Sequence, residues 1–160
     1  MLFADLGLSQ PILDTLSSIG YTEPTDVQRR SIPIVLSGQD MVVSAQTGTG
    51  KTASFVLPVL ERLSKKVDGE SIKVRAKRVR ALIVVPTREL AVQVERSIGQ
   101  YGQNLLLTSM AMYGGVDAQD QKQRLIWGVD LLVATPGRLL DMLHQRAVHF
   151  DALEVFILDE

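Results

Sequence analysis

The 160-residue sequence contains no cysteine, which excludes a disulfide framework and cysteine-based zinc sites. Its two histidines, His144 and His149, have no cluster of ligand-type residues near them, so we do not expect a histidine-based metal site. No apolar run approaches the roughly 20 residues that a membrane span requires. The first residues do not resemble a signal peptide, because Asp5 and the polar residues after it interrupt any hydrophobic segment. We therefore expect a cytoplasmic location and no membrane partner.

The formal net charge of −1 gives the chain as a whole no nucleic-acid signature. Positive charge is concentrated between residues 65 and 80, where the basic side chains are Lys65, Lys66, Lys73, Arg75, Lys77, Arg78 and Arg80. Only Asp68 and Glu70 oppose them. Such a stretch is either a solvated connection between a helix and a strand, or a loop that attracts a polyanion by screened electrostatics.

The most informative segment is Ala-Gln-Thr-Gly-Thr-Gly-Lys-Thr at residues 45–52. The β-prone run 41–44 precedes it and a helical pattern follows, which is the context of a phosphate-binding P-loop. Backbone N–H groups of such a loop point at phosphate oxygens, Lys51 reaches the β- and γ-phosphates, and the Thr52 hydroxyl can ligate Mg²⁺. Ala45 replaces the usual first glycine, so the alternative is a surface turn rich in glycine and threonine.

A second signal is the acidic pair Asp159-Glu160, which follows the apolar run 155–158. A P-loop enzyme needs one carboxylate for Mg²⁺ and a second carboxylate that orients the attacking water. Ligands of open parallel sheets lie beyond the carboxyl ends of the strands, so we expect the P-loop and this pair to converge.

The remaining pattern alternates strands and helices after a helical start. Helices are predicted from Ser9 to Gly20, from Thr25 to about Leu36, after the P-loop, near 117–126 and near 136–145. A further helix is predicted to carry an apolar stripe of Leu90, Val94, Ile98 and Tyr101. Strands are predicted at 41–44, 81–85, 109–112, 130–134 and 155–158. This order predicts an α/β fold with a parallel sheet and helices on both faces.

Gln28 has two interpretations. The spacing Thr25-x-x-Gln28 fits a helix capping box, in which the glutamine side chain reaches back to the threonine backbone. Alternatively, the amide reads adenine by accepting from N6 and donating to N7. From spacing alone the cap is favoured, and the aromatic rings of Phe3 and Tyr21 are as consistent with a core as with base stacking.

Three further junctions fall where strands should end: residues 86–91, the doublet Gly114-Gly115, and residues 135–138. Two of them combine a helix N-terminus with an arginine, which suits phosphate oxygens, and the glycines let a ligand backbone approach closely. Each alone is ordinary loop sequence. Together, on the edge expected to carry the P-loop, they predict a track long enough for a polynucleotide strand.

These residues together resemble the DEAD-box family of ATP-dependent RNA helicases. Residues 20–28 resemble its Q motif with Phe3 upstream, residues 45–52 its motif I, and residues 86–91 its motif Ia. Gly114-Gly115 resembles the glycine doublet, residues 135–138 motif Ib, and Asp159-Glu160 the first half of motif II. The opening residues and residues 144–160 are most similar to the bacterial RhlE-like subgroup.

The resemblance implies a RecA-like P-loop NTPase fold and roles for individual residues. It implies catalysis by Lys51 and Glu160, and Mg²⁺ binding by Thr52 and Asp159. The ATP site would comprise Phe3, Tyr21, Gln28, Ala45, Gln46, Thr47, Gly48, Thr49, Gly50, Lys51 and Thr52. The RNA backbone would be held by Pro86, Thr87, Arg88, Gly114, Gly115, Thr135, Pro136, Gly137 and Arg138.

We expect residues 1–36 to form a helical segment with the Q motif and residues 37–160 to form RecA-like domain 1. In the family, Ala-Asp, a Ser-Ala-Thr motif and a second RecA-like domain with an arginine finger follow Glu160. Without them, we expect a monomer with weak nucleotide binding and negligible turnover. The alternatives are a DNA-directed translocase of the wider helicase superfamily and a nucleotide-binding module without catalysis.

Overall fold

The computed structural model describes residues 1–65 and 76–160, which form two compact units. The first unit comprises residues 1–65 and 97–106, and the second comprises the described residues of 76–96 and 107–160. Lys66, Lys73 and Arg75 lie outside the described residues, so both interpretations of the basic stretch stay predictions. Among the described residues, no helix is both long and apolar enough to cross a bilayer.

The first unit is helical. It contains a 3₁₀ turn η1 (Phe3–Leu6) and the helices α1 (Gln10–Ser18), α2 (Asp26–Leu36) and α3 (Lys51–Ser64). Helix α2 packs against α3, and Ile12, Leu16, Ile32, Leu57 and Leu60 are completely or almost completely buried. Polar contacts add to this core, because the Ser9 N–H donates to the buried carboxylate of Glu61 at 2.9 Å.

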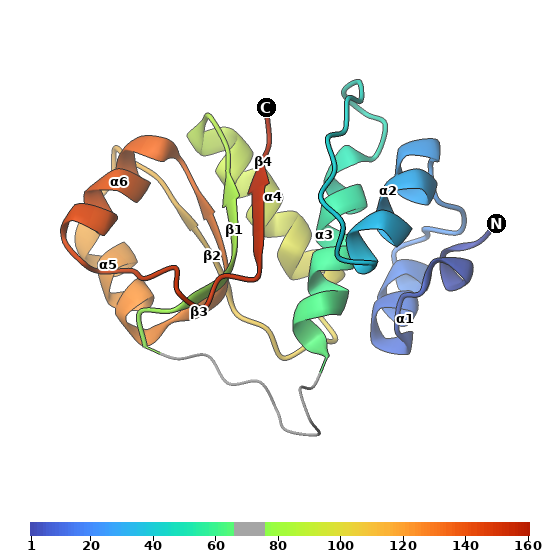
Figure 1. Ribbon diagram of the computed structural model, residues 1–160, viewed down its shortest axis with the longest axis horizontal. Helices are drawn as coiled ribbons and strands as arrows, with labels where there is room; N and C mark the ends of the chain where they lie inside the picture. The colour runs from blue at the N-terminus through green and yellow to red at the C-terminus, as the bar shows by residue number, and fades with distance from the viewer. Residues whose placement is uncertain (66–75) are drawn as a thin grey trace. The chain divides into compact units, whose positions relative to one another are not determined.

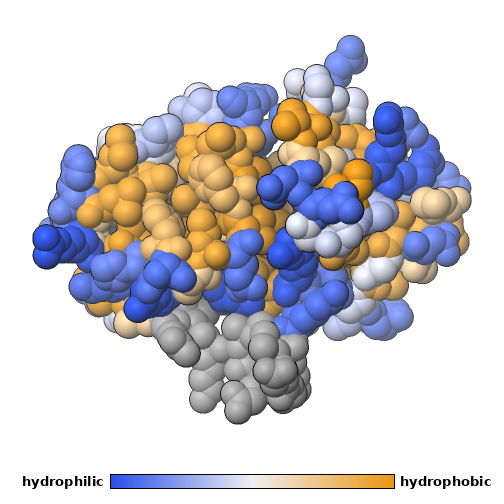
Figure 2. All heavy atoms as spheres, viewed as in Figure 1, coloured by the Kyte–Doolittle hydropathy of each residue, from blue (hydrophilic) through white to orange (hydrophobic). Residues whose placement is uncertain are grey.

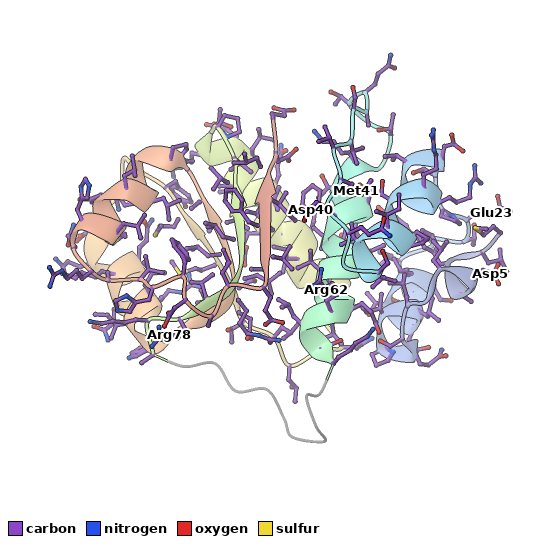
Figure 3. The ribbon with its side chains drawn as sticks, in the orientation of Figure 1. Asp5, Glu23, Asp40, Met41, Arg62 and Arg78 are labelled. Carbon is purple, nitrogen blue, oxygen red and sulfur yellow. The ribbon has the colours of Figure 1, made fainter. Side chains whose placement is uncertain are left out.

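The predicted strand at 41–44 is wrong. The segment has no strand assignment, and among the described residues it pairs with no strand (Figure 3 labels Met41 at its start). The Val42 side chain is fully exposed to solvent. A β-prone sequence forms a strand only where a neighbour supplies hydrogen bonds and a surface to pack on, because β-propensity depends on context.

The second unit contains a four-stranded sheet in the order β2-β3-β1-β4 (Figure 1). The strands are β1 (Val79–Val84), β2 (Ser109–Met112), β3 (Val129–Ala134) and β4 (Val155–Leu158), and all three pairings are parallel. The predicted strands at 109–112 and 155–158 are confirmed to the residue. Strands β1 and β3 are almost entirely buried, as expected for strands covered on both faces, although each carries one charged side chain, Arg80 or Asp130.

Helices cover both faces of this sheet. The face that carries Leu82 and Leu132 packs against α5 (Ala118–Trp127) and α6 (Pro136–His144), which contribute Leu125 and Met142 to the core. On the opposite face, the helix α4 (Arg88–Tyr101) follows β1, and its Glu95 accepts a hydrogen bond from Ser109 at 3.1 Å. The predicted α/β architecture is therefore confirmed.

Edge strand β4 is covered less completely. Phe156 is 55% exposed and Leu158 is 70% exposed, although their partners in β1, Leu82 and Val84, are buried and partly buried respectively. Figure 2 shows apolar side chains gathered over the visible face of the second unit. Helices α5 and α6 thus cover the other three strands and leave these two side chains exposed.

A buried polar network closes the amino ends of the strands. The Arg80 side chain, 7% exposed, donates to Glu154 at 2.7 Å and to Asp130 at 3.3 Å. Asp130 also accepts from the backbone N–H of Thr108 at 2.9 Å. The network therefore links β1 and β3 with the segments that precede β2 and β4.

Candidate nucleotide site and sheet edge

The P-loop segment ends in a turn at residues 47–50 that leads directly into α3. Gly48 and Gly50 both have φ of +84°, in the left-handed region, and Thr49 between them does not. Left-handed residues in such a turn are typical of loops whose successive N–H groups face an anion. The N-terminus of α3 adds partial positive charge, and no side chain caps it.

The other residues of the segment fit this use. Gln46, Thr47 and Gly48 are exposed, and the Thr49 hydroxyl donates to the Gln46 carbonyl at 2.6 Å. Lys51 and Thr52, the first two residues of α3, are partly exposed, as is Ala45. The loop can therefore receive a phosphate group without rearrangement of a buried side chain.

The Gln28 side chain joins helix α2 to this loop. Its Oε1 accepts from the Thr25 N–H at 3.0 Å, and its Nε2 donates to the Gly50 carbonyl at 3.1 Å. The Gln28 N–H donates to the Thr25 hydroxyl at 3.4 Å, so the predicted capping box is confirmed.

The contacts to Thr25 and Gly50 leave part of the hydrogen-bonding capacity of the Gln28 amide unused. An amide oxygen accepts two hydrogen bonds and its NH₂ group donates two, so one of each is left after the contacts to Thr25 and Gly50. The remaining acceptor and donor match the N6 amino group and the N7 atom of adenine. The cap and the adenine-reading interpretations are therefore compatible, although Gln28 is only 3% exposed in this structure.

Phe3 and Tyr21 belong to a cluster of three aromatic rings. The ring of Phe3, which is 4% exposed, stacks on Tyr21 with centroids 6.5 Å apart. The Tyr21 hydroxyl lies 3.2 Å from that of Tyr101, at the end of α4. Burial, together with this hydrogen bond, raises the pKa of Tyr101. Tyr101 was predicted only as part of an apolar helix stripe, and its contact with the Q motif was missed.

In the second unit, the parallel strands bring four of the predicted motifs to one edge. Along the sheet order, Gly114-Gly115 follows β2, Thr135 follows β3, Pro86 and Thr87 follow β1, and Asp159-Glu160 follows β4. The ladder continues to this edge, because the Thr135 N–H donates to Met112 and the Asp159 N–H to Val84, both at 3.0 Å. Asp159 is 8% exposed and Glu160 is exposed.

At the start of α4, Thr87 and Arg88 differ in what they contact. The Thr87 hydroxyl accepts from the Leu90 N–H at 3.2 Å and so caps the helix. The exposed Arg88 places its guanidinium 4.8 Å above the Tyr113 ring, at the end of β2. Since Arg88 follows β1 and Tyr113 follows β2, the contact passes over the end of β3, which lies between them. The guanidinium stays exposed to solvent.

The glycines of this edge have open space around them. A Cβ added at Gly114, Gly115 or Gly137 would meet no atom within 4 Å. Gly137 is the second residue of α6, after Pro136, and the N-cap residue Thr135 makes no side-chain capping bond. The N–H groups in the first turn of α6 are thus available to a ligand.

Arg138 is placed differently from the other predicted RNA contacts. Its side chain is 12% exposed and bonds to Gln121 of α5 and to the Val116 carbonyl. Sequence reasoning did not single out Gln121, since a glutamine inside an amphipathic helix carries no motif.

The P-loop lies in the first unit, and the carboxylates of Asp159 and Glu160 lie in the second. Their convergence stays a prediction. Within the described part of the chain, no group of three or more acidic or histidine side chains could hold a metal ion. A Mg²⁺ that travels with nucleotide phosphates takes only one or two carboxylates from the protein, so Thr52 and Asp159 suit that kind of binding.

A glycine loop with left-handed glycines at a helix N-terminus, together with a parallel sheet whose motifs meet at the carboxyl edge, defines a RecA-like P-loop nucleotide-binding domain. The model of the DEAD/DEAH box helicase family matches residues 25–160, and the chain belongs to that family.

Curated relatives agree with this assignment. Over 159 residues the chain is 43% identical to the mouse "Probable ATP-dependent RNA helicase DDX27", covering 99% of this chain and 20% of the relative. It is 39% identical to the "RNA helicase CrhR" of Synechocystis, covering 99% of this chain and 30% of the relative. It is also 39% identical to the "ATP-dependent RNA helicase CshA" of Limosilactobacillus reuteri, covering 100% and 30% respectively. The chain thus spans less than a third of the length of these relatives.

Proposed function

We propose that this chain is the nucleotide-binding domain of an ATP-dependent RNA helicase. In the whole protein, ATP hydrolysis would separate short RNA duplexes or remodel RNA–protein complexes. The names of the curated relatives support this proposal, and so do the P-loop of the first unit and the sheet edge of the second, each taken by itself.

The roles of the charged residues follow from the chemistry of phosphoryl transfer. That reaction is catalysed mainly by positioning and by stabilising negative charge, and bound Mg²⁺ neutralises part of this charge. The P-loop N–H groups and Lys51 bind the phosphates, while Thr52 and Asp159 hold the metal ion. Glu160 orients the attacking water.

RNA is bound at the sheet edge through its sugar–phosphate backbone. The exposed guanidinium of Arg88, the open glycines and the first turn of α6 offer N–H groups to phosphate oxygens. Contacts of this kind carry no base information, so we expect little sequence specificity.

The observation that carries the nucleotide assignment is the bond from Gln28 Nε2 to the Gly50 carbonyl. This bond joins the last glycine of the phosphate loop to an amide that carries the donor and the acceptor that adenine recognition requires. Adenine recognition by a bidentate amide is worth about 1–3 kcal/mol against the wrong base. We therefore expect this protein to prefer ADP to GDP by roughly 5- to 100-fold.

The test measures binding of fluorescent ADP and GDP, with Mg²⁺, to the wild type and to two variants. Gln28→Ala should abolish the preference for ADP. Thr25→Ala is the matched control, because it removes the capping hydroxyl and costs about 1 kcal/mol of stability while keeping the amide. It should retain the preference. Two results would contradict the proposal: the wild type binds both nucleotides equally, or the preference for ADP survives Gln28→Ala. Either result would mean that Gln28 caps the helix and does not recognise adenine.

Finer assignments are also part of the proposal. Similarity of residues 144–160 and of the opening residues supports the RhlE-like subgroup. In the whole protein a second RecA-like domain would supply an arginine finger, which is worth about 10³–10⁵ in rate in other NTPases. We accordingly expect these 160 residues alone to bind ATP weakly and to hydrolyse it negligibly, as a monomer located in the cytoplasm.

A further inference from the structure

The Arg138 guanidinium connects three parts of the second unit. Its Nη1 donates to Gln121 Oε1 at 3.1 Å, and its Nη2 donates to the Val116 carbonyl at 3.0 Å. Its Nε lies 3.9 Å from an oxygen of Asp141, one turn further along α6. Helix α6 is thereby linked to α5 and to the loop that follows β2.

Two hydrogen bonds and one longer ion-pair contact thus hold a side chain that is only 12% exposed. A guanidinium has five N–H donors in a fixed planar arrangement, so it cannot turn toward a phosphate and keep these partners. Arg88 differs in each respect, because it is exposed and its guanidinium lies on the surface of an aromatic ring. Arg88 is therefore available to contact a bound anion, whereas Arg138 could do so only by giving up its present partners.

The loop held by Arg138 contains the glycine doublet. Gly115 has φ of +81°, and both glycines are exposed with open space around them. At its far end the Asp117 carboxylate caps α5 by accepting from the Gln119 N–H at 2.9 Å. Between the doublet and this cap, the Val116 carbonyl is bonded to Arg138.

We propose that Arg138 and Gln121 are positioning residues, which fix the loop 114–116 so that its backbone can receive an RNA phosphate. Gln121, 8% exposed, holds the guanidinium in the orientation that reaches Val116. Arg138 itself contributes no phosphate contact. This inference rests on the proposed RNA-binding function.

The salt dependence of RNA binding separates positioning from direct contact. For single strands, the logarithm of the binding constant falls with the logarithm of salt concentration, with a slope of about −0.7 per phosphate contact. Removal of a phosphate ligand lowers the magnitude of that slope. Loss of a positioning residue weakens binding at every salt concentration and leaves the slope nearly unchanged.

The experiment titrates a fluorescent oligouridine with this protein, in the presence of a non-hydrolysable ATP analogue, at several salt concentrations. Gln121→Leu, Arg138→Lys and Arg138→Gln should each weaken binding about 5-fold or more, the equivalent of one hydrogen bond, with the wild-type slope. Arg88→Gln should reduce the slope by about 0.7. Gln123→Leu, at an exposed glutamine on the same helix, is the control and should bind as the wild type does.

Four results would overturn the inference, and they are distinguishable. Arg138→Lys that binds RNA normally, or a slope that falls in Arg138→Gln as it does in Arg88→Gln, would make Arg138 a phosphate ligand. Normal binding by Gln121→Leu would remove Gln121 from the site. Absence of RNA binding by the wild type would instead overturn the proposed function, and this inference with it.

Discussion

The two ends of the same four parallel strands differ in how their polar groups are used. At the amino ends, the Arg80 guanidinium donates to both Asp130 and Glu154, and Arg80 and Asp130 are almost inaccessible to solvent. At the carboxyl ends, the polar groups are exposed backbone N–H groups, open glycines and the surface guanidinium of Arg88. At the amino end the charged groups are paired inside the protein, apart from Arg80 Nη2, which is buried without a partner among the described residues. The carboxyl end instead exposes an arginine and open glycines to a ligand.

The difference follows from the polarity of a parallel sheet. Every strand enters its following loop at the same edge, and here β1 and β3 lead into the N-termini of α4 and α6. Helix N-termini carry unsatisfied N–H groups and partial positive charge, so this edge attracts anions. Substitutions at the amino end should accordingly change stability, and substitutions at the carboxyl end should change binding.

The largest expected effect is at the amino end. Asp130→Ala leaves the Arg80 guanidinium buried without its partner on β3, and breaking a buried pair in this way costs about 3–5 kcal/mol. We expect a loss of this size in the free energy of unfolding, measured by urea denaturation.

The double variant Arg80→Met/Asp130→Leu is the control for this prediction. Replacing a buried ion pair by apolar side chains of similar volume is often neutral or stabilising, so the double variant should recover most of the lost stability. An Asp130→Ala variant as stable as the wild type would show that the amino end does not depend on its network.

The P-loop offers a matched pair of glycines with an intermediate effect. Gly48 and Gly50 share φ of +84°, but a Cβ at Gly50 would lie 2.4 Å from Gln28 Nε2, and one at Gly48 would meet nothing within 4 Å. Left-handed strain costs about 1–2 kcal/mol in either position. Gly50→Ala should therefore be less stable than Gly48→Ala and should also weaken ADP binding more.

Thermal unfolding and fluorescent ADP titration of the two glycine variants, side by side, check this prediction. Equal losses would mean that only the backbone conformation matters. The contact between Gln28 and the loop would then have no measurable role in nucleotide binding.

The smallest effect on stability is expected at the carboxyl end. Gly137→Ala places a methyl group in open space in the first turn of α6, where alanine favours the helix by up to about 1 kcal/mol. The variant should be as stable as the wild type or slightly more stable. It should nevertheless bind oligouridine about 5-fold or more weakly, because under the proposed function the methyl group would lie where the RNA backbone is expected to pass. Unchanged RNA binding would show that the RNA strand does not pass close to the N-terminus of α6.

The sequence was sufficient to predict most of the architecture, for physical reasons that act locally. The unbroken apolar run at 81–85 predicts a strand covered on both faces, and the structure has β1 there. Thr25 and Gln28 predict a helix start, because the capping bonds involve residues three positions apart. The alternation of strands and helices then fixes a parallel sheet, whose carboxyl edge collects the motifs.

The features that were missed depend on residues distant in the sequence. The bond between Arg138 and Gln121 joins two helices, and the Arg80 network depends on which strands are neighbours and in what register. The failed strand at 41–44 shows the same limit, since its propensity could not reveal whether a partner strand lies beside it. Local pattern predicts the elements, and the pairing of elements decides which polar side chains meet.

The strand order β2-β3-β1-β4 also rearranges the motifs relative to the printed sequence. A ligand that moves along the edge meets residues 114–115 first, then 135–137, then 86–88, and the pair 159–160 last. Neighbouring strands are about 4.8 Å apart, so the whole series spans roughly 15 Å. A mutational profile plotted by residue number would show scattered peaks, whereas the same data ordered by position along the edge would form one continuous footprint.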